Sequence, residues 1–266
     1  MNAADNIPVH IENASSSGII LWLTGWSLPD TVFDRLRELL PEYTHVSVEY
    51  NDADSPENML HITETVARKI LFVDEAGCSK RRFQGPILIS GWSLGSLLAL
   101  RLAANGYADG LVLFGATARF TRSKEEGILG WADACVRQMI RGISKDQPAV
   151  ETKFRQFMFT DIEWESGLAA NLPPIGSWTA PALISGLQIL RSEECLSRLP
   201  NITCPVLLIH GTEDKICSYN AALELKDKLP QAKLVTLHAC GHVPFLEREV
   251  HIAEELRRWW HDQQQN

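Results

Sequence analysis

The segment of this chain that is most informative about its fold is Pro86-Ile87-Leu88-Ile89-Ser90-Gly91-Trp92-Ser93-Leu94-Gly95. An apolar run, Pro86 to Ser90, leads directly into a G-x-S-x-G pentapeptide, and a helical pattern begins at Leu94. This context predicts a sharp strand-to-helix turn that exposes Ser93 as a nucleophile. Gly91 and Gly95 fit because larger side chains there would collide with the strand or the helix. A glycine-rich turn whose serine only caps the helix is the alternative.

Strands and helices alternate around this turn. Short apolar runs bounded by turn residues predict buried strands, and periodic patterns between them predict helices. Strands that are apolar on both faces indicate a mostly parallel sheet covered on both sides, an α/β class. The predicted strands are Ile19 to Leu23, Val46 to Tyr50, Pro86 to Ser90, Leu111 to Phe114, Val206 to His210 and Leu234 to Leu237, and the predicted helices are Thr31 to Leu40, Ile62 to Glu75, Leu94 to Ala104, Asn220 to Leu229 and Val250 to Trp260.

The alternation stops between Ala116 and Pro200, where helical patterns dominate and no convincing strand is found. We therefore expect a core formed by residues 1–116 and 201–266, with an inserted helical lid at residues 117–200. Pro173-Pro174 and Gly176 predict a bend inside the lid. The predicted lid helices are Gly130 to Arg141, Ala149 to Phe159 and Ala182 to Leu190.

A serine nucleophile needs a base, and the base needs an orienting carboxylate. Asp214 follows a predicted strand in the spacing Gly211-Thr212-Glu213-Asp214, which is the spacing used by serine hydrolases of this kind, and Glu213 is the competing acid. His242 lies on a loop after the last predicted strand, whereas His210 falls inside a strand and fits a core histidine. The predicted catalytic residues are Ser93, Asp214 and His242.

An oxyanion hole needs two backbone N–H groups. Leu94 follows the nucleophile and Trp26 follows the first predicted strand, so we expect their amides to form it. Aromatic side chains of the core and the lid predict an apolar acyl slot, although ordinary packing explains them equally well. The slot residues are Trp26, Trp92, Phe157 and Phe159.

The amino-acid composition limits the classes of binding partner that the chain can have. The chain has 266 residues, 25 Lys and Arg against 33 Asp and Glu, and a net charge of −8, which disfavours nucleic acid and anionic membranes. No metal, nucleotide or other cofactor motif is found. Six cysteines without regular spacing predict reduced thiols, and residues 1–13 lack a signal-peptide pattern, so we expect a cytoplasmic protein. We also expect a monomer.

The strand-to-helix turn, the predicted catalytic residues and the alternation of strands and helices described above resemble those of a known superfamily. Along nearly its whole length the chain resembles the α/β-hydrolase superfamily, and it is most similar to the BioH-type pimeloyl-[acyl-carrier protein] methyl ester esterases. The matching stretches are Gly25-Trp26, Gly91 to Gly95, Gly186-Leu187-Gln188-Ile189-Leu190 and Gly241-His242-Val243-Pro244-Phe245. The chain departs from that family at Thr24, where a histidine is usual, and at Ser96, where a second glycine often follows.

The resemblance implies a serine carboxylesterase that removes the methyl ester from a pimeloyl chain on acyl carrier protein, in biotin synthesis. A general short-acyl carboxylesterase, a carbon–carbon bond hydrolase, an acyltransferase and a ligand receptor remain alternatives on this fold.

The acidic carrier that the resemblance implies needs a basic landing site. The segment between Thr117 and Thr160 contains eight Lys and Arg residues and five Asp and Glu residues, which is a local excess of positive charge in an acidic chain. A solvated helix face with incidental charge is the alternative. The candidate docking residues are Arg137, Arg141, Lys153 and Arg155.

Overall fold

The computed structural model describes residues 17–75, 78–81 and 83–265, so the N-terminal residues considered above lie outside it. A six-stranded sheet in the order β10-β9-β6-β5-β1-β2 forms the centre. Every pairing in it is parallel. The strands are β1 (Ile19–Leu23), β2 (Thr44–Val48), β5 (Ile87–Trp92), β6 (Gly110–Phe114), β9 (Val206–Gly211) and β10 (Ala232–Leu237).

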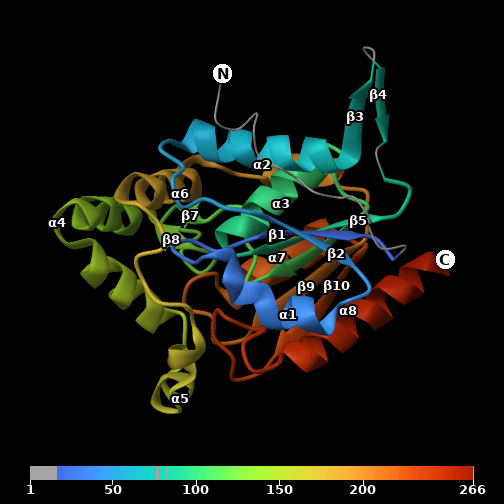
Figure 1. Ribbon diagram of the computed structural model, residues 1–266. Coiled ribbons are helices and arrows are strands. Elements are labelled where there is room, and N and C mark those ends of the chain that lie inside the picture. The colour runs from blue at the N-terminus through green and yellow to red at the C-terminus, as the bar shows by residue number, and fades with distance from the viewer. Residues whose placement is uncertain (1–16, 76–77, 82, 266) are drawn as a thin grey trace.

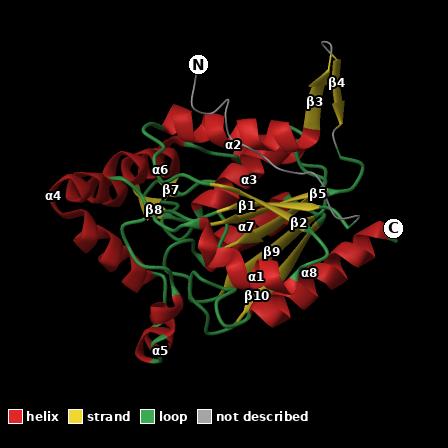
Figure 2. Cartoon of the chain, viewed as in Figure 1, coloured by secondary structure: helices red, strands yellow, loops and turns green. Residues whose placement is uncertain are grey.

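Helices cover both faces of the sheet (Figures 1 and 2). On one face α1 (Asp34–Leu39), preceded by the 3₁₀ turn η2 (Asp30–Phe33), packs against α8 (Glu249–Gln264). On the other lie α2 (Pro56–Leu71), α3 (Leu94–Ala104) and α7 (Tyr219–Lys228). Because both faces are covered, all residues of β1, β5, β6 and β9 are buried. The predicted α/β fold class is confirmed.

Residues 117–200, here called the insertion, join β6 to β9, which are neighbours in the sheet. The long helix α4 (Asp133–Phe157) has a non-helical residue at Asp146, just before Pro148, which divides it into two arms. Gly176, at φ 88°, lies in the predicted bend. The other elements are β7 (Thr121–Arg122), β8 (Trp131–Ala132), α5 (Asp161–Glu165), η3 (Leu168–Asn171), α6 (Ala180–Ser192) and η4 (Leu196–Asn201).

Three sequence predictions need correction. The helix predicted over Ile62 to Glu75 begins at Pro56, because the Ser55 hydroxyl accepts from the Asn58 N–H and caps it, and ends at Leu71. Residues 72–81 instead contribute the antiparallel pair β3 (Phe72–Glu75) and β4 (Cys78–Arg81), which projects from the body in Figure 1. The strand predicted from Val46 begins at Thr44, and the insertion does contain strands, the two-residue β7 and β8.

The topology brings four loops to one edge of the sheet. Neighbouring parallel strands end at the same edge, so the loops after β1, β5, β9 and β10 all emerge there. These loops carry Trp26, Ser93, Asp214 and His242. None of the helices in the described ranges is long and apolar enough to cross a membrane.

Candidate active site

Ser93 stands on a strained turn between β5 and α3. Its φ of 56° and ψ of −115° are unfavourable for a residue with a side chain. A side chain at Gly91 would collide with the Gly95 backbone, and one at Gly95 with the Leu23 carbonyl group. Ser96 fits the turn because its hydroxyl donates to the carbonyl oxygens of Gly91 at 2.6 Å and Phe114 at 3.0 Å. The turn has the geometry that the pentapeptide predicts.

Asp214 and His242 form a buried pair. Asp214 Oδ2 lies 2.7 Å from His242 Nδ1, and neither side chain is exposed. The other carboxylate oxygen accepts the N–H groups of Ile216 at 2.8 Å and Cys217 at 2.9 Å. Although burial raises the pKa of the Asp214 carboxyl, the neighbouring His242 and His210 hold it well below its ordinary value. Glu213, the competing acid, is exposed.

The second ring nitrogen of the histidine is available for proton transfer. His242 Nε2 is buried and has no hydrogen-bond partner among the described residues. With the proton on Nδ1 shared with Asp214, Nε2 is an acceptor. Gly115, at φ 50°, allows this packing, because a Cβ there would lie 3.0 Å from both Cε1 and Nδ1 of His242.

Two further side chains surround the acid. His210 Nε2 lies 2.7 Å from the Cys217 carbonyl oxygen and 3.3 Å from Asp214 Oδ2. Both neighbours accept hydrogen bonds, so Nε2 carries a proton. Burial raises the pKa of the Cys217 thiol, the Asp214 charge raises it further, and a hydrogen bond with Ser93 opposes both. Cys217 is therefore a neutral thiol beside Ser93 rather than a competing nucleophile.

The loop after β1 approaches the N-terminus of α3. A Cβ on Gly95 would meet the carbonyl groups of both Leu23 and Thr24, which places this loop against the start of the helix. The structure gives neither the Trp26 nor the Leu94 backbone N–H an acceptor among the described residues. Leu94 directly follows Ser93 in the chain, and unpaired backbone donors are the groups that stabilise a developing oxyanion.

The insertion also contacts the loop that carries His242. The His242 N–H donates to the Met158 carbonyl oxygen at 2.6 Å, and the Gly241 N–H donates to Glu163 Oε2 at 3.0 Å. Glu163 caps α5 together with Thr160 and pairs with Arg248 at 3.2 Å. The position of the histidine therefore depends on the insertion as well as on the sheet.

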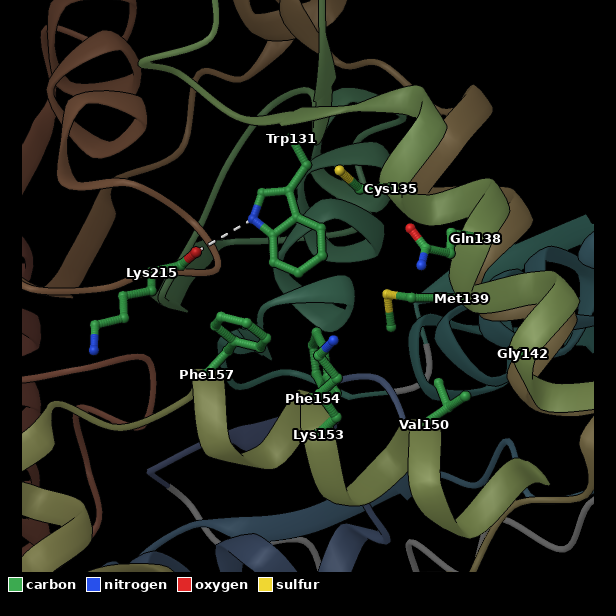
Figure 3. A pocket seen from close by; sticks show the side chains of 10 residues that line it. All are labelled: Trp131, Cys135, Gln138, Met139, Gly142, Val150, Lys153, Phe154, Phe157 and Lys215. Atoms are coloured by element: carbon green, nitrogen blue, oxygen red, sulfur yellow. Dashed lines mark hydrogen bonds between the residues drawn. The ribbon is translucent and has the colours of Figure 1, made fainter.

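A pocket of about 680 Å³ opens between the two arms of α4 (Figure 3). Cys135, Gln138 and Met139 come from the first arm, and Val150, Phe154 and Phe157 from the second. Trp131 lies across one end, where its Nε1 donates to the Lys215 carbonyl oxygen at 3.2 Å. Because Lys215 follows Asp214, the pocket reaches the loop that carries the acid.

The structure brings together only some of the expected slot residues. Phe157 lines the pocket, and the Trp26 ring packs edge-on against Phe154 with centroids 4.8 Å apart. Trp92 is fully buried, donates from Nε1 to the His242 carbonyl oxygen at 2.8 Å and packs edge-on against Phe245. Phe159 is buried beside Trp164. Neither Trp92 nor Phe159 is among the residues that line the pocket.

The expected docking residues differ in their surroundings. Arg137 is half exposed and pairs with Asp133 at 2.5 Å, while Arg141 and Lys153 are exposed on opposite arms of α4. Arg155 is partly buried and donates to the carbonyl oxygens of Pro173 and Pro174. Its guanidinium therefore holds the bend of the insertion.

Three polar contacts of the site were not foreseen from the sequence: those of His210, Glu163 and Glu151. Glu151 is 1% exposed, and its carboxylate accepts from the Ser27 hydroxyl at 2.6 Å. A signal for Glu151 existed, because it shares helical spacing with the buried residues Phe154 and Met158. A carboxylate on an apolar helix face calls for a specific partner.

Comparison with known proteins identifies the family of this chain. The model of a family described as "Serine aminopeptidase, S33", one of the α/β-hydrolases, matches residues 62–249, more than half of the chain. The chain belongs to this α/β-hydrolase family. The solved structure of a thermophilic esterase from Thermogutta terrifontis superposes on this hydrolase with a TM-score of 0.73, at 16% identity over 94% of this chain and 91% of that one.

Two relatives named pimeloyl-[acyl-carrier protein] methyl ester esterase are similar to this hydrolase in sequence. The protein from Nitrosomonas europaea is 28% identical, over 90% of this chain and 94% of its own length. The protein from Aromatoleum aromaticum is 30% identical, over 60% of this chain and 68% of its own. Together with the family match, these relatives show that this protein is a serine hydrolase that acts on carboxylic ester bonds.

Proposed function

We propose that this hydrolase removes the methyl ester from a pimeloyl chain carried on acyl carrier protein, a step of biotin synthesis. The observation that carries the proposal is the 28% identity, over 94% of its length, with a protein that bears this name. The strained Ser93, the Asp214–His242 pair and the apolar pocket in the insertion support it.

The proposed reaction has two steps. His242 Nε2 takes the proton of the Ser93 hydroxyl while the oxygen attacks the ester carbonyl, and the Trp26 and Leu94 N–H groups stabilise the oxyanion. The tetrahedral intermediate collapses, methoxide leaves with the proton from His242 as methanol, and an acyl-serine remains. Water then attacks in the same way, releases the free carboxylate and restores Ser93. Asp214 orients the imidazole and stabilises its charged form.

The insertion supplies the parts that would recognise the substrate. We propose that it acts as the lid, that the acyl arm passes along the pocket lined by Phe154 and Phe157, and that Arg137, Arg141 and Lys153 receive the acidic carrier. Arg155 would contribute indirectly, by holding the bend at Pro173 and Pro174.

Two measurements test this function. Expression of the protein is expected to rescue a biotin-requiring host that lacks its own methyl ester esterase, while Ser93→Ala does not. In vitro, methanol release from the carrier-bound ester is expected to exceed release from a free pimelate methyl ester of equal concentration. Equal rates on the two esters, together with no rescue, would instead indicate a general short-acyl carboxylesterase.

A further inference from the structure

Ser27, on the loop after β1, has a backbone conformation that needs support. It follows Trp26, whose N–H is proposed to stabilise the oxyanion, and its φ is 70°, in the left-handed region that side-chain-bearing residues rarely adopt. Its side chain is fully buried. Because φ of Ser27 helps to set the path of this loop, the contact that holds Ser27 also influences the direction of the Trp26 N–H.

The contact comes from the insertion. The Ser27 hydroxyl donates to Glu151 Oε1 at 2.6 Å, a short hydrogen bond between residues 124 positions apart. The same carboxylate accepts the Gly176 N–H at 3.4 Å and the Gln147 side-chain amide at 3.1 Å. These hydrogen bonds come from neutral groups, while the Arg155 guanidinium, one turn along α4, interacts with the carboxylate electrostatically. A carboxylate that is 1% exposed is costly to bury, which favours a specific role over a contribution to stability.

Other contacts join the insertion to the same loop. Trp26 Nε1 donates to the Leu183 carbonyl oxygen of α6 at 2.8 Å, and Trp178 Nε1 donates to the Leu28 carbonyl oxygen at 3.1 Å. Gln147 also bonds the Trp178 carbonyl oxygen at 3.1 Å, which closes a ring of hydrogen bonds with Glu151. In Figure 1, α4 and α6 lie together at one end of the molecule, and residues of these two helices are in contact.

We propose that Glu151 is a positioning residue that couples the insertion to the oxyanion loop, by holding Ser27 so that the Trp26 N–H points at the developing oxyanion. Displacement of α4 from the core would break the Ser27 hydrogen bond and release the loop. The oxyanion of the transition state would therefore be fully stabilised only while α4 packs against the core and the Ser27–Glu151 hydrogen bond is intact. This inference rests on ester hydrolysis by Ser93.

The test compares Ser27 and Glu151 variants in the full-length protein with p-nitrophenyl butyrate. Ser27→Ala removes the hydroxyl, and Ser27→Gly removes it while relieving the positive φ. We expect both to lower kcat roughly tenfold with little change in KM. The reason is that the misplaced N–H donor would contact the oxyanion, which exists only in the transition state, and not the bound ester. Affinity for a trifluoromethyl ketone, which forms an oxyanion adduct on Ser93, is expected to fall by the same factor.

Glu151→Leu removes the Ser27 hydrogen bond together with the contacts to Gly176 and Gln147, so kcat is expected to fall at least as far as in Ser27→Ala. Ser27→Ala combined with Glu151→Leu is expected to lower kcat no further than Glu151→Leu alone, because the Ser27–Glu151 hydrogen bond is already lost. Glu151→Gln keeps an acceptor oxygen for Ser27 and is expected to retain most activity. Thr152→Ala, at an exposed neighbour on the same helix, is the matched control and is expected to leave kcat unchanged. Thermal unfolding of each variant measures loss of folding separately.

The outcomes separate the two proposals. Ser27 variants with unchanged kcat, additive double-variant effects, or a fall in kcat without weaker ketone binding would each overturn the coupling. Should Ser93→Ala hydrolyse the ester as fast as the unaltered protein, ester hydrolysis by Ser93 fails and the coupling fails with it. If Ser93→Ala is inactive while both Ser27 variants keep full kcat, only the coupling fails.

Discussion

Replacing His210 with phenylalanine tests whether a second histidine supports the catalytic acid. His210 Nε2 lies 3.3 Å from Asp214 Oδ2 and 2.7 Å from the Cys217 carbonyl oxygen, in a site where the histidine is 1% exposed. Phenylalanine keeps a ring of similar size against Tyr219, whose ring centroid lies 6.1 Å away, but it has no N–H to donate.

The magnitude follows from the two hydrogen bonds. A hydrogen bond to a charged group contributes about 1.5–3 kcal/mol. The bond to Asp214 is long and its proton is shared with a carbonyl, so we take the lower end, about 1.5 kcal/mol, which corresponds to roughly a tenfold fall in kcat/KM. The Cys217 carbonyl oxygen also loses its donor, which costs about 1–3 kcal/mol of folding stability.

The assay measures kcat and KM with p-nitrophenyl butyrate, and urea unfolding measures stability. His210→Gln retains an N–H donor and is expected to recover most of the activity. His238→Gln, at an exposed histidine after β10, is the matched control. If His210→Phe unfolds more easily but keeps kcat/KM within about twofold, a change of less than 0.5 kcal/mol, His210 only fills space in the core.

Three further outcomes are expected. Phe157→Asp raises KM for long-chain p-nitrophenyl esters more than for the acetate, because a charge enters the apolar pocket, and equal effects on both would remove the acyl route. Reversal of Arg137, Arg141 and Lys153 to glutamate slows methanol release from the carrier-bound ester at low salt but not from a free ester, and an unchanged carrier rate would eliminate the landing site. Burial lowers the pKa of the His45 imidazole below its ordinary value, so the unfolded chain takes up the proton first and the free energy of unfolding falls as the pH drops from neutral through that value. His45→Gln should therefore flatten the fall in urea midpoint between neutral pH and about pH 5, and an equally steep fall would contradict this assignment.

The sequence was informative where local pattern and long-range packing require the same thing. The apolar run Ile19 to Leu23 and the helix Leu94 to Ala104 have the predicted bounds, because the strand is entirely buried, nine of the eleven helix residues are buried, and turn residues end both. The order of Ser93, Asp214 and His242 along the chain also indicated one site, since each follows a strand of a parallel sheet.

Side-chain contacts between residues far apart in the chain could not be predicted from the sequence. The sequence predicts that His210 lies in a buried strand, and the structure agrees. The sequence does not predict the contact with Asp214, because that contact depends on how the turn after β9 folds back toward His210. Trp92 and Phe159 are of the aromatic residue type that often lines pockets, yet neither lines the pocket between the arms of α4. Aromatic residues pack and line pockets with the same side chains, so composition does not separate these roles.

Methanol release from the methyl ester of pimeloyl-acyl carrier protein is the direct measurement of the proposed esterase activity. We expect the unaltered protein to release one methanol per ester, and Ser93→Ala, His242→Ala and Asp214→Asn each to be slower by about a thousandfold or more, because the three residues act as one unit. Glu213→Gln, at the exposed neighbouring acid, is expected to keep the normal rate. Release by Ser93→Ala at the rate of the unaltered protein would contradict Ser93 as the nucleophile, and a larger loss in Glu213→Gln than in Asp214→Asn would contradict Asp214 as the acid.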